Sequence, residues 1–146
     1  MTIVLRGSDA LHLLSNTVVA TSAATGGRYS LYRIDLAPRS GGAKPHLHTR
    51  FAESFTVLAG EVALYDGATW VPAVEGDHLF VPECGVHGFR NDTDVPAALL
   101  MMSTPGAPRE DYFAELAEVF ASGRELSAEE WTALYARHDQ VMVQGA

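Results

Sequence analysis

The sequence predicts an all-β domain with C-terminal helices, and two patterns carry this prediction. Between residues 28 and 103, short runs of β-branched and aromatic residues are separated by glycine, proline and aspartate, as in an antiparallel sandwich or barrel. After Pro105 and Pro108, the apolar residues recur with a helical period instead. The chain has 146 residues, 47% of them hydrophobic, which suffices for one good core, so we expect a single domain.

The β region divides into six expected strands joined by recognisable turns. Asp66 and Gly67 indicate a hairpin, because both residues tolerate the positive φ of a tight primed turn. Gly60 and Gly76 mark two further reversals. Because no helix interrupts the series, a closed or double-sheet β architecture is favoured. The expected strands span residues 29–36, 53–58, 62–65, 78–81, 88–90 and 97–103.

The flanking segments are expected to belong to the same domain. Residues 1–27 form an N-terminal edge segment, in which 3–5 and 17–19 are candidate edge strands that two subunits can exchange. Residues 28–104 form the barrel, and residues 105–146 form a helical extension. The first helix ends at Gly123, and Ser127 and Glu130 form a capping box that begins a second helix over residues 128–137. The apolar faces that we expect to pack on the barrel are Tyr112, Phe113, Leu116, Val119 and Phe120 in the first helix and Trp131, Leu134 and Tyr135 in the second.

Composition excludes two classes of partner. Ten basic against eighteen acidic residues give a formal net charge of −8, which disfavours nucleic acid and anionic membranes. Between residues 110 and 139, eight acidic residues face only two basic ones, and we interpret this segment as a solvated helix surface. The single cysteine, Cys84, has no intrachain partner for a disulfide, and the N-terminus lacks a secretory signal pattern. We therefore expect a cytoplasmic protein.

Three histidines and one glutamate have the spacing of a metal site. His46 and His48 alternate on a strand and so point to the same side, and Glu53 follows after four intervening residues. His87, from a distant segment, completes the set. Imidazole and carboxylate ligands suit iron, manganese, nickel, cobalt or zinc, and they leave open positions for oxygen, water or substrate. The alternative is that these are ordinary hydrogen-bonded residues. His12, His78 and His138 lie outside the spacing.

The residues around this set resemble the two motifs of the cupin family. The first motif, HxH with a glutamate and a closing glycine, is matched by His46, His48, Glu53 and Gly60. The second motif, a glycine, a proline, a histidine and an asparagine, is matched by Gly76, Pro82, His87 and Asn91. The chain departs from the pattern at two glycine positions, which are occupied by Ser40 and Cys84. The likeness extends over residues 28–103.

The resemblance to a small single-domain cupin implies a jelly-roll β-barrel, also called a double-stranded β-helix, with a divalent transition metal inside. It implies that His46, His48, Glu53 and His87 hold the metal, and that two copies pair as a homodimer by strand exchange. Within the family, the acidic, aromatic helix after Pro105 is similar to that of bacterial proteins likened to quercetin dioxygenase. This likeness implies a dioxygenase in which Glu53 is both ligand and proton acceptor, with helices that cap the barrel mouth.

Strand alternation suggests which side chains form the substrate pocket. Phe51 and Phe55 lie on the side of Glu53, and Phe89 on the side of His87, so these rings are expected to line an apolar cavity for a small organic substrate. Tyr32 and Met101 are further candidates from neighbouring strands. Phe55 is equally well explained as barrel core. Two other functions remain open: an oxygen-independent isomerase, cyclase or lyase that uses the same metal, and a non-catalytic module that binds a small molecule.

Overall fold

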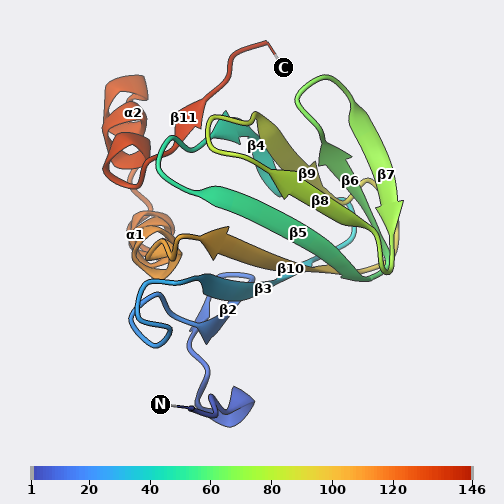
Figure 1. The fold of residues 1–146 in the computed structure, drawn as a ribbon. Coiled ribbons are helices and arrows are strands. Elements are labelled where there is room, and N and C mark those ends of the chain that lie inside the picture. Colours follow the sequence, from blue (N-terminus) through green and yellow to red (C-terminus); the bar gives the residue numbers. More distant parts are fainter. Residues whose placement is uncertain (1, 146) are drawn as a thin grey trace.

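Two antiparallel sheets with two helices beside them make up the computed structural model, which describes residues 2–145 (Figure 1). The six-stranded sheet has the order β1 (His12–Leu13), β2 (Asn16–Ala20), β3 (Ser30–Leu36), β10 (Ala97–Thr104), β5 (Ala52–Ala59), β8 (His78–Val81). The five-stranded sheet has the order β11 (Val141–Met142), β4 (Ala43–Leu47), β9 (His87–Arg90), β6 (Glu61–Tyr65), β7 (Trp70–Val74). A short 3-10 helix spans Gly7–Asp9, and the helices are α1 (Arg109–Ser122) and α2 (Ala128–Arg137). The end residues of the expected edge segment and helical extension, Met1 and Ala146, lie outside the described residues.

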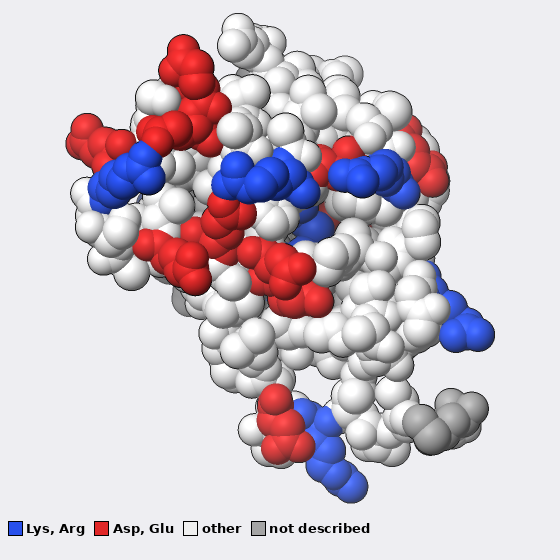
Figure 2. Space-filling view, turned by 90° about the vertical axis from the view of Figure 1, so that its left-hand side faces the viewer, with Lys and Arg blue, Asp and Glu red and all other residues white. Residues whose placement is uncertain are grey.

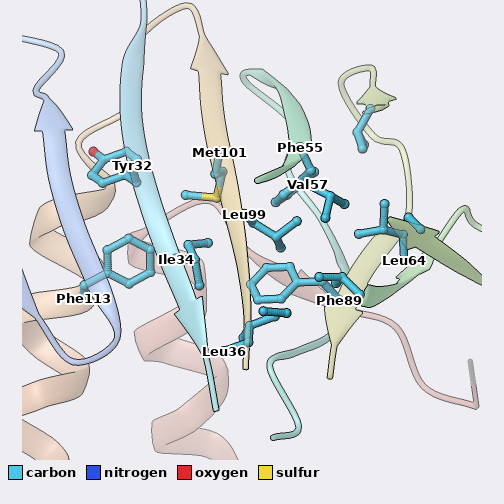
Figure 3. Packing of buried hydrophobic residues seen from close by; sticks show 14 of the residues in the cluster. Tyr32, Ile34, Leu36, Phe55, Val57, Leu64, Phe89, Leu99, Met101 and Phe113 are labelled. Atoms are coloured by element: carbon cyan, nitrogen blue, oxygen red, sulfur yellow. The ribbon is translucent and has the colours of Figure 1, made fainter. Parts of the chain in front are cut away.

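The core lies between the two sheets. Along β3, buried and more exposed residues alternate, as the pleat of a half-buried strand requires. Figure 3 shows Ile34 of β3 and Leu99 of β10 beside Val57 of β5, with Phe89 and Leu64 reaching toward them from the other sheet. Leu99 is fully buried and Val57 is 1% exposed. The double-sheet β architecture predicted from the sequence is therefore confirmed.

The turns follow the glycines, with one difference. Gly60 joins β5 to β6 with φ of +71°, and a Cβ there would lie 2.5 Å from the carbonyl oxygen of Pro96. The β6–β7 hairpin is present, but its loop spans residues 66–69. Gly67 has a positive φ, whereas Asp66 does not; its carboxylate accepts hydrogen bonds from the amides of Ala68 and Thr69 instead. The expected tight primed turn is thus wrong, because the aspartate caps a longer loop.

Several strands lie outside the periodic runs. β4 contains Lys44 and Pro45, and β7 contains Pro72, and such residues disfavour a strand. Both segments are strands in the structure because a neighbouring strand pairs with each of them. β1 and β11 have two residues each and exist through pairing with β2 and β4. The candidate strand at 17–19 lies within β2, whereas residues 3–5 form no strand and are exposed.

Both helices lie on one side of the barrel, next to β11 and β3 (Figure 1). Ser127 and Glu130 form the predicted capping box, and Gly123 ends α1 with φ of +65°. Leu134 is 1% exposed, but Phe120 is 60% exposed, so the expectation that Phe120 packs on the barrel is wrong. Among the described residues, the helices are too short and too polar to cross a membrane.

Candidate metal centre

Three strands of the two sheets bring the predicted ligands together. His46 lies near the end of β4 and His48 directly follows this strand, while His87 is the first residue of β9 and pairs with His46 across the five-stranded sheet. Glu53 comes from β5 of the facing sheet. We call these four residues the His–Glu cluster. All four are buried, with exposed fractions between 1% and 4%.

The side chains of the His–Glu cluster point at one another. One nitrogen or carboxylate oxygen from each residue lies within 4.8 Å of those of the other three. Oε2 of Glu53 is 2.8 Å from Nε2 of His87 and 3.2 Å from Nε2 of His48. The ring centroids of His46 and His87 are 4.4 Å apart. This spacing leaves the donor atoms around one common point.

Backbone carbonyls fix the orientation of all three imidazoles. The Nδ1 atoms of His46, His48 and His87 lie 2.7, 2.6 and 3.0 Å from the carbonyl oxygens of Lys44, Asp139 and Gly85. A carbonyl oxygen can only accept, so each Nδ1 carries a proton and donates it. The Nε2 atoms that face the His–Glu cluster are therefore the ones available as ligands, which is the arrangement of metal-bound histidines.

This donor set fits a cation. A neutral imidazole protonated on Nδ1 presents a lone pair at Nε2, so at 2.8 Å the His87 nitrogen and the Glu53 oxygen repel unless a proton or a metal ion lies between them. Nε2 of His48 is buried and, among the described residues, has no hydrogen-bond partner. Buried polar atoms without partners are destabilising, and a metal ion bound by the His–Glu cluster would satisfy them together.

Burial and mutual proximity tune the charges of the His–Glu cluster. Burial, together with the neighbouring His87 and His48, lowers the pKa of His46 to about 3, so His46 is neutral near pH 7. Burial opposes ionisation of Glu53, but the close imidazoles of His48 and His87 outweigh it and hold the pKa of this carboxyl well below its usual range. Neutral imidazole and ionised carboxylate are the forms that bind metals.

Most of the predicted pocket residues surround the His–Glu cluster. Phe55, Phe89 and Met101 line a cavity of about 50 Å³ together with His46 and Glu53. Residues of α1 complete this lining, namely Arg109, Tyr112 and Phe113.

Phe51 and Tyr32 have other positions. Phe51 stacks on the His48 ring, with centroids 4.4 Å apart, and it lines a larger pocket of about 310 Å³. Tyr32 lines neither cavity, because its hydroxyl is engaged by Glu110 and by the carbonyl of Ala107.

Cys84 and the remaining histidines lie outside the His–Glu cluster. Cys84 is exposed, has φ of +64°, and its amide donates to the carbonyl of His48 over 2.6 Å. The glycine position of the motif is thus a left-handed turn position that this chain fills with cysteine. His12 and His78 contact neighbouring threonines, and His138 contacts Glu115.

Sequence reasoning missed the contribution of the C-terminal segment. Besides the carbonyl that orients His48, Asp139 offers a carboxylate that accepts hydrogen bonds from the amides of Thr49 and Arg50 over 2.9 and 2.8 Å. The following strand, β11, pairs with β4 beside His46. No local pattern marks Asp139. Arg109 could have been singled out from the sequence, because a cation in the first turn of a helix interacts unfavourably with the helix dipole, and such exceptions often mark functional sites.

The fold and the buried His–Glu cluster define a double-stranded β-helix protein with a candidate metal centre. Residues 32–103 match the family model described as the cupin domain. The chain therefore carries a cupin domain and is a small cupin, as the motifs predicted.

The similar proteins differ in what their names describe. An uncharacterized protein of Aquifex aeolicus is 36% identical over 59 residues, which cover 40% of this chain, and the chain spans about half (49%) of that relative. A predicted oxalate decarboxylase from Thermotoga maritima has a TM-score of 0.63 at 22% identity, over 70% of this chain and 99% of the other. The polyketide cyclase RemF from Streptomyces resistomycificus has a TM-score of 0.59 at 19% identity, over 74% and 82%. A sugar phosphate isomerase from Silicibacter pomeroyi has a TM-score of 0.52 at 26% identity, over 62% and 59%.

Proposed function

We propose that this cupin is a metal-dependent enzyme that acts on a small organic molecule, with the His–Glu cluster as its metal ligands. The observation that carries the proposal is the orientation of the three imidazoles. Each Nδ1–H is held by a backbone carbonyl, so the three Nε2 atoms and the Glu53 carboxylate are prepared for one cation. A bound iron, manganese, nickel, cobalt or zinc ion supplies open positions and polarises a substrate oxygen.

The protein's own residues supply the rest of the site. The carboxylate of Glu53 is the only acidic group in the His–Glu cluster, and we assign it the role of proton acceptor as well as ligand. Ser103 lies 3.5 Å from its other oxygen and limits its rotation. Phe55, Phe89 and Met101 form an apolar wall beside the ligands, which excludes water, and the larger pocket beside Phe51 has room for an organic substrate.

For the reaction we favour dioxygenase chemistry of the quercetinase type. Three imidazoles and one carboxylate beside aromatic side chains support it, because these ligands suit the metals that such chemistry needs and the aromatic side chains suit an organic ring. Oxygen-independent isomerisation, cyclisation or lyase chemistry is the second candidate. The similarity to a sugar phosphate isomerase at 26% identity favours it.

Two experiments test the proposal. Elemental analysis of the purified protein is expected to find close to one equivalent of a transition metal, and replacing His46 and His87 together by alanine should remove it. Unchanged metal content in that double variant would refute the ligand assignment. Oxygen uptake is then measured with flavonol and diketone substrates. Turnover that persists under strict anaerobiosis would select the oxygen-independent reaction.

We also propose the setting in which the enzyme works. Residues 28–104 form the barrel of a single domain that includes the segments on either side. Two copies are expected to form a homodimer in the cytoplasm, in keeping with the lone exposed Cys84. Gel filtration that finds only a 15.7 kDa species would contradict the homodimer.

A further inference from the structure

A buried arginine lies beside the candidate metal centre without an acidic partner. Arg109, the first residue of α1, is 5% exposed. Within residues 2–145, no carboxylate oxygen lies within 4.0 Å of its guanidinium. Arginine stays charged in proteins, and a buried charge is normally paired. This arginine therefore lacks the partner that its burial calls for.

Neutral groups satisfy only part of the guanidinium. One terminal nitrogen donates to the carbonyl of His138 over 2.9 Å, and the other donates to Oε1 of Gln140 over 2.8 Å. The guanidinium lies over the Tyr112 ring, 4.3 Å from its centroid. Nε of Arg109 is buried and has no acceptor in the part of the chain that the structure describes. These contacts hold the side chain in one orientation and leave Nε, with its N–H, without an acceptor among residues 2–145.

Arg109 lies between the inner cavity and the surface of the protein. It lines the 50 Å³ cavity that includes His46 and Glu53, and it also lines the 310 Å³ pocket that includes Phe51. Arg50 and Arg137 contribute to the same outer pocket, where Arg50 pairs with Asp139 and Arg137 pairs with Glu115. Figure 2 shows basic side chains in a row across the face that carries the helices, with a further basic group recessed in the hollow below them. Acidic side chains lie close to this row as well. Among the described arginines that line the outer pocket, Arg109 is the one without a carboxylate oxygen within 4.0 Å.

The charge balance of a metal-loaded site favours an anionic ligand. Glu53 is the only anionic ligand in the His–Glu cluster, while a divalent ion and Arg109 bring three positive charges. The three imidazoles are each protonated on Nδ1 only, so they are neutral and add no charge. The metal ion, Arg109 and Glu53 together would therefore carry a net charge of +2 in a buried volume, where charge interactions are strong, and Asp139 at the outer pocket offsets it only in part. A substrate that carries negative charge would neutralise the remainder.

We propose that Arg109 binds the carboxylate of the substrate, and that the protein acts on small organic acids. This inference deepens the proposed function and rests on it for the metal. Arginine recognises a carboxylate through its planar, directional N–H groups. The outer pocket has the volume of a site for a compact ligand, so the acid group would lie at Arg109 and the rest of the molecule toward Phe51. Arg109 acts here as a specificity-determining residue.

The test compares an acid with its uncharged analogue. Benzoate and benzamide are titrated by calorimetry against the metal-free and the Co²⁺-loaded protein, and Co²⁺ content is measured separately. We expect the wild type to bind benzoate at least 10-fold more tightly than benzamide. Arg109→Gln should weaken benzoate binding by about 10- to 100-fold and leave benzamide binding and Co²⁺ content unchanged. Arg33→Gln, which removes an exposed arginine on β3, serves as the matched control and should change neither affinity.

The outcomes separate the anion site from the metal site and from a structural role. Arg109→Lys keeps the charge, and its affinity for benzoate is expected to lie between those of the wild type and Arg109→Gln. This variant keeps the proposal testable if Arg109→Gln does not fold. A residue that only anchors the C-terminal segment would lower the melting temperature without changing the benzoate-to-benzamide ratio. An unchanged ratio in both variants, or no preference for benzoate in the wild type, overturns the proposal. Absent Co²⁺ uptake with Arg109-dependent benzoate binding would refute the proposed metal enzyme and keep the anion site.

Discussion

Replacing Glu53 by glutamine tests whether the His–Glu cluster binds a metal ion. The substitution keeps the shape of the side chain and removes its charge. In the metal-free protein the amide nitrogen can donate to Nε2 of His87, now 2.8 Å from Oε2, so the variant should fold. In the metal-loaded protein the variant loses the only anionic ligand of the cluster.

The expected magnitude follows from charge interactions and mass action. Two unit charges about 4 Å apart attract by about 4 kcal/mol at an effective dielectric constant near 20. Desolvation offsets part of this, so we expect at least about 100-fold weaker metal binding, equivalent to about 2.7 kcal/mol. At a metal concentration 100 times the dissociation constant, the wild type gains about 2.7 kcal/mol of stability. At about 3 °C per kcal/mol for a chain of this length, the melting temperature should rise by about 8 °C in the wild type and by about 1 °C in the variant.

Differential scanning calorimetry with and without Mn²⁺ or Zn²⁺ measures this difference. Glu61→Gln removes an exposed glutamate from β6 and is the matched control, for which the full metal-induced shift is expected. Glu53→Gln should also abolish turnover, because it removes the proton acceptor. A variant that keeps the whole shift of about 8 °C at the metal concentration defined above would refute the assignment of Glu53 as a ligand.

Three further substitutions probe the parts that support the site. Asp139→Asn should lower stability by about 1–2 kcal/mol in EDTA, because the carboxylate accepts two backbone amides. Hydrogen bonds from Thr49 and Arg50 hold the pKa of Asp139 below 3.8 despite burial. The difference in stability between wild type and variant should therefore persist above pH 3.8 and vanish as the pH falls through the lowered pKa. A difference that does not change with pH in urea titrations would contradict this prediction. Asn91→Ala should lower the free energy of unfolding by about 2–4 kcal/mol, because the side chain is 1% exposed and hydrogen-bonds three backbone carbonyls. A loss under about 1 kcal/mol in the same titrations would argue against this structural role. Cys84→Gly should raise stability by about 0.5–1 kcal/mol, since the position has φ of +64°, and destabilisation would show that the cysteine side chain makes an undetected contact.

Local sequence patterns predicted the elements whose residues alternate or repeat regularly. β3 and β10 were predicted to within one residue at each end, because one face of each strand is buried and the other is not. The capping box of α2 was predicted as well, because its two hydrogen bonds form within four residues. β7 was missed because it contains a proline, and β4 was expected only at His46 and His48, because the part before them contains a proline and depends on pairing with the distant β9.

The sequence by itself determined which residues make up the candidate site and that strands of the barrel carry them. The spacing of the four ligand residues predicts the site: His46, His48, Glu53 and His87. Strand alternation, with the chain reversals at Gly60 and Gly76, suffices to turn these side chains toward the inside of the barrel. Only the tertiary structure decided what orients and surrounds them. Asp139 and Arg109 reach the site through the packing of α1 and β11 against the barrel. No local periodicity records the hydrogen bond between Asp139 and His48, 91 positions apart, or the cavity that Arg109 shares with His46, 63 positions away.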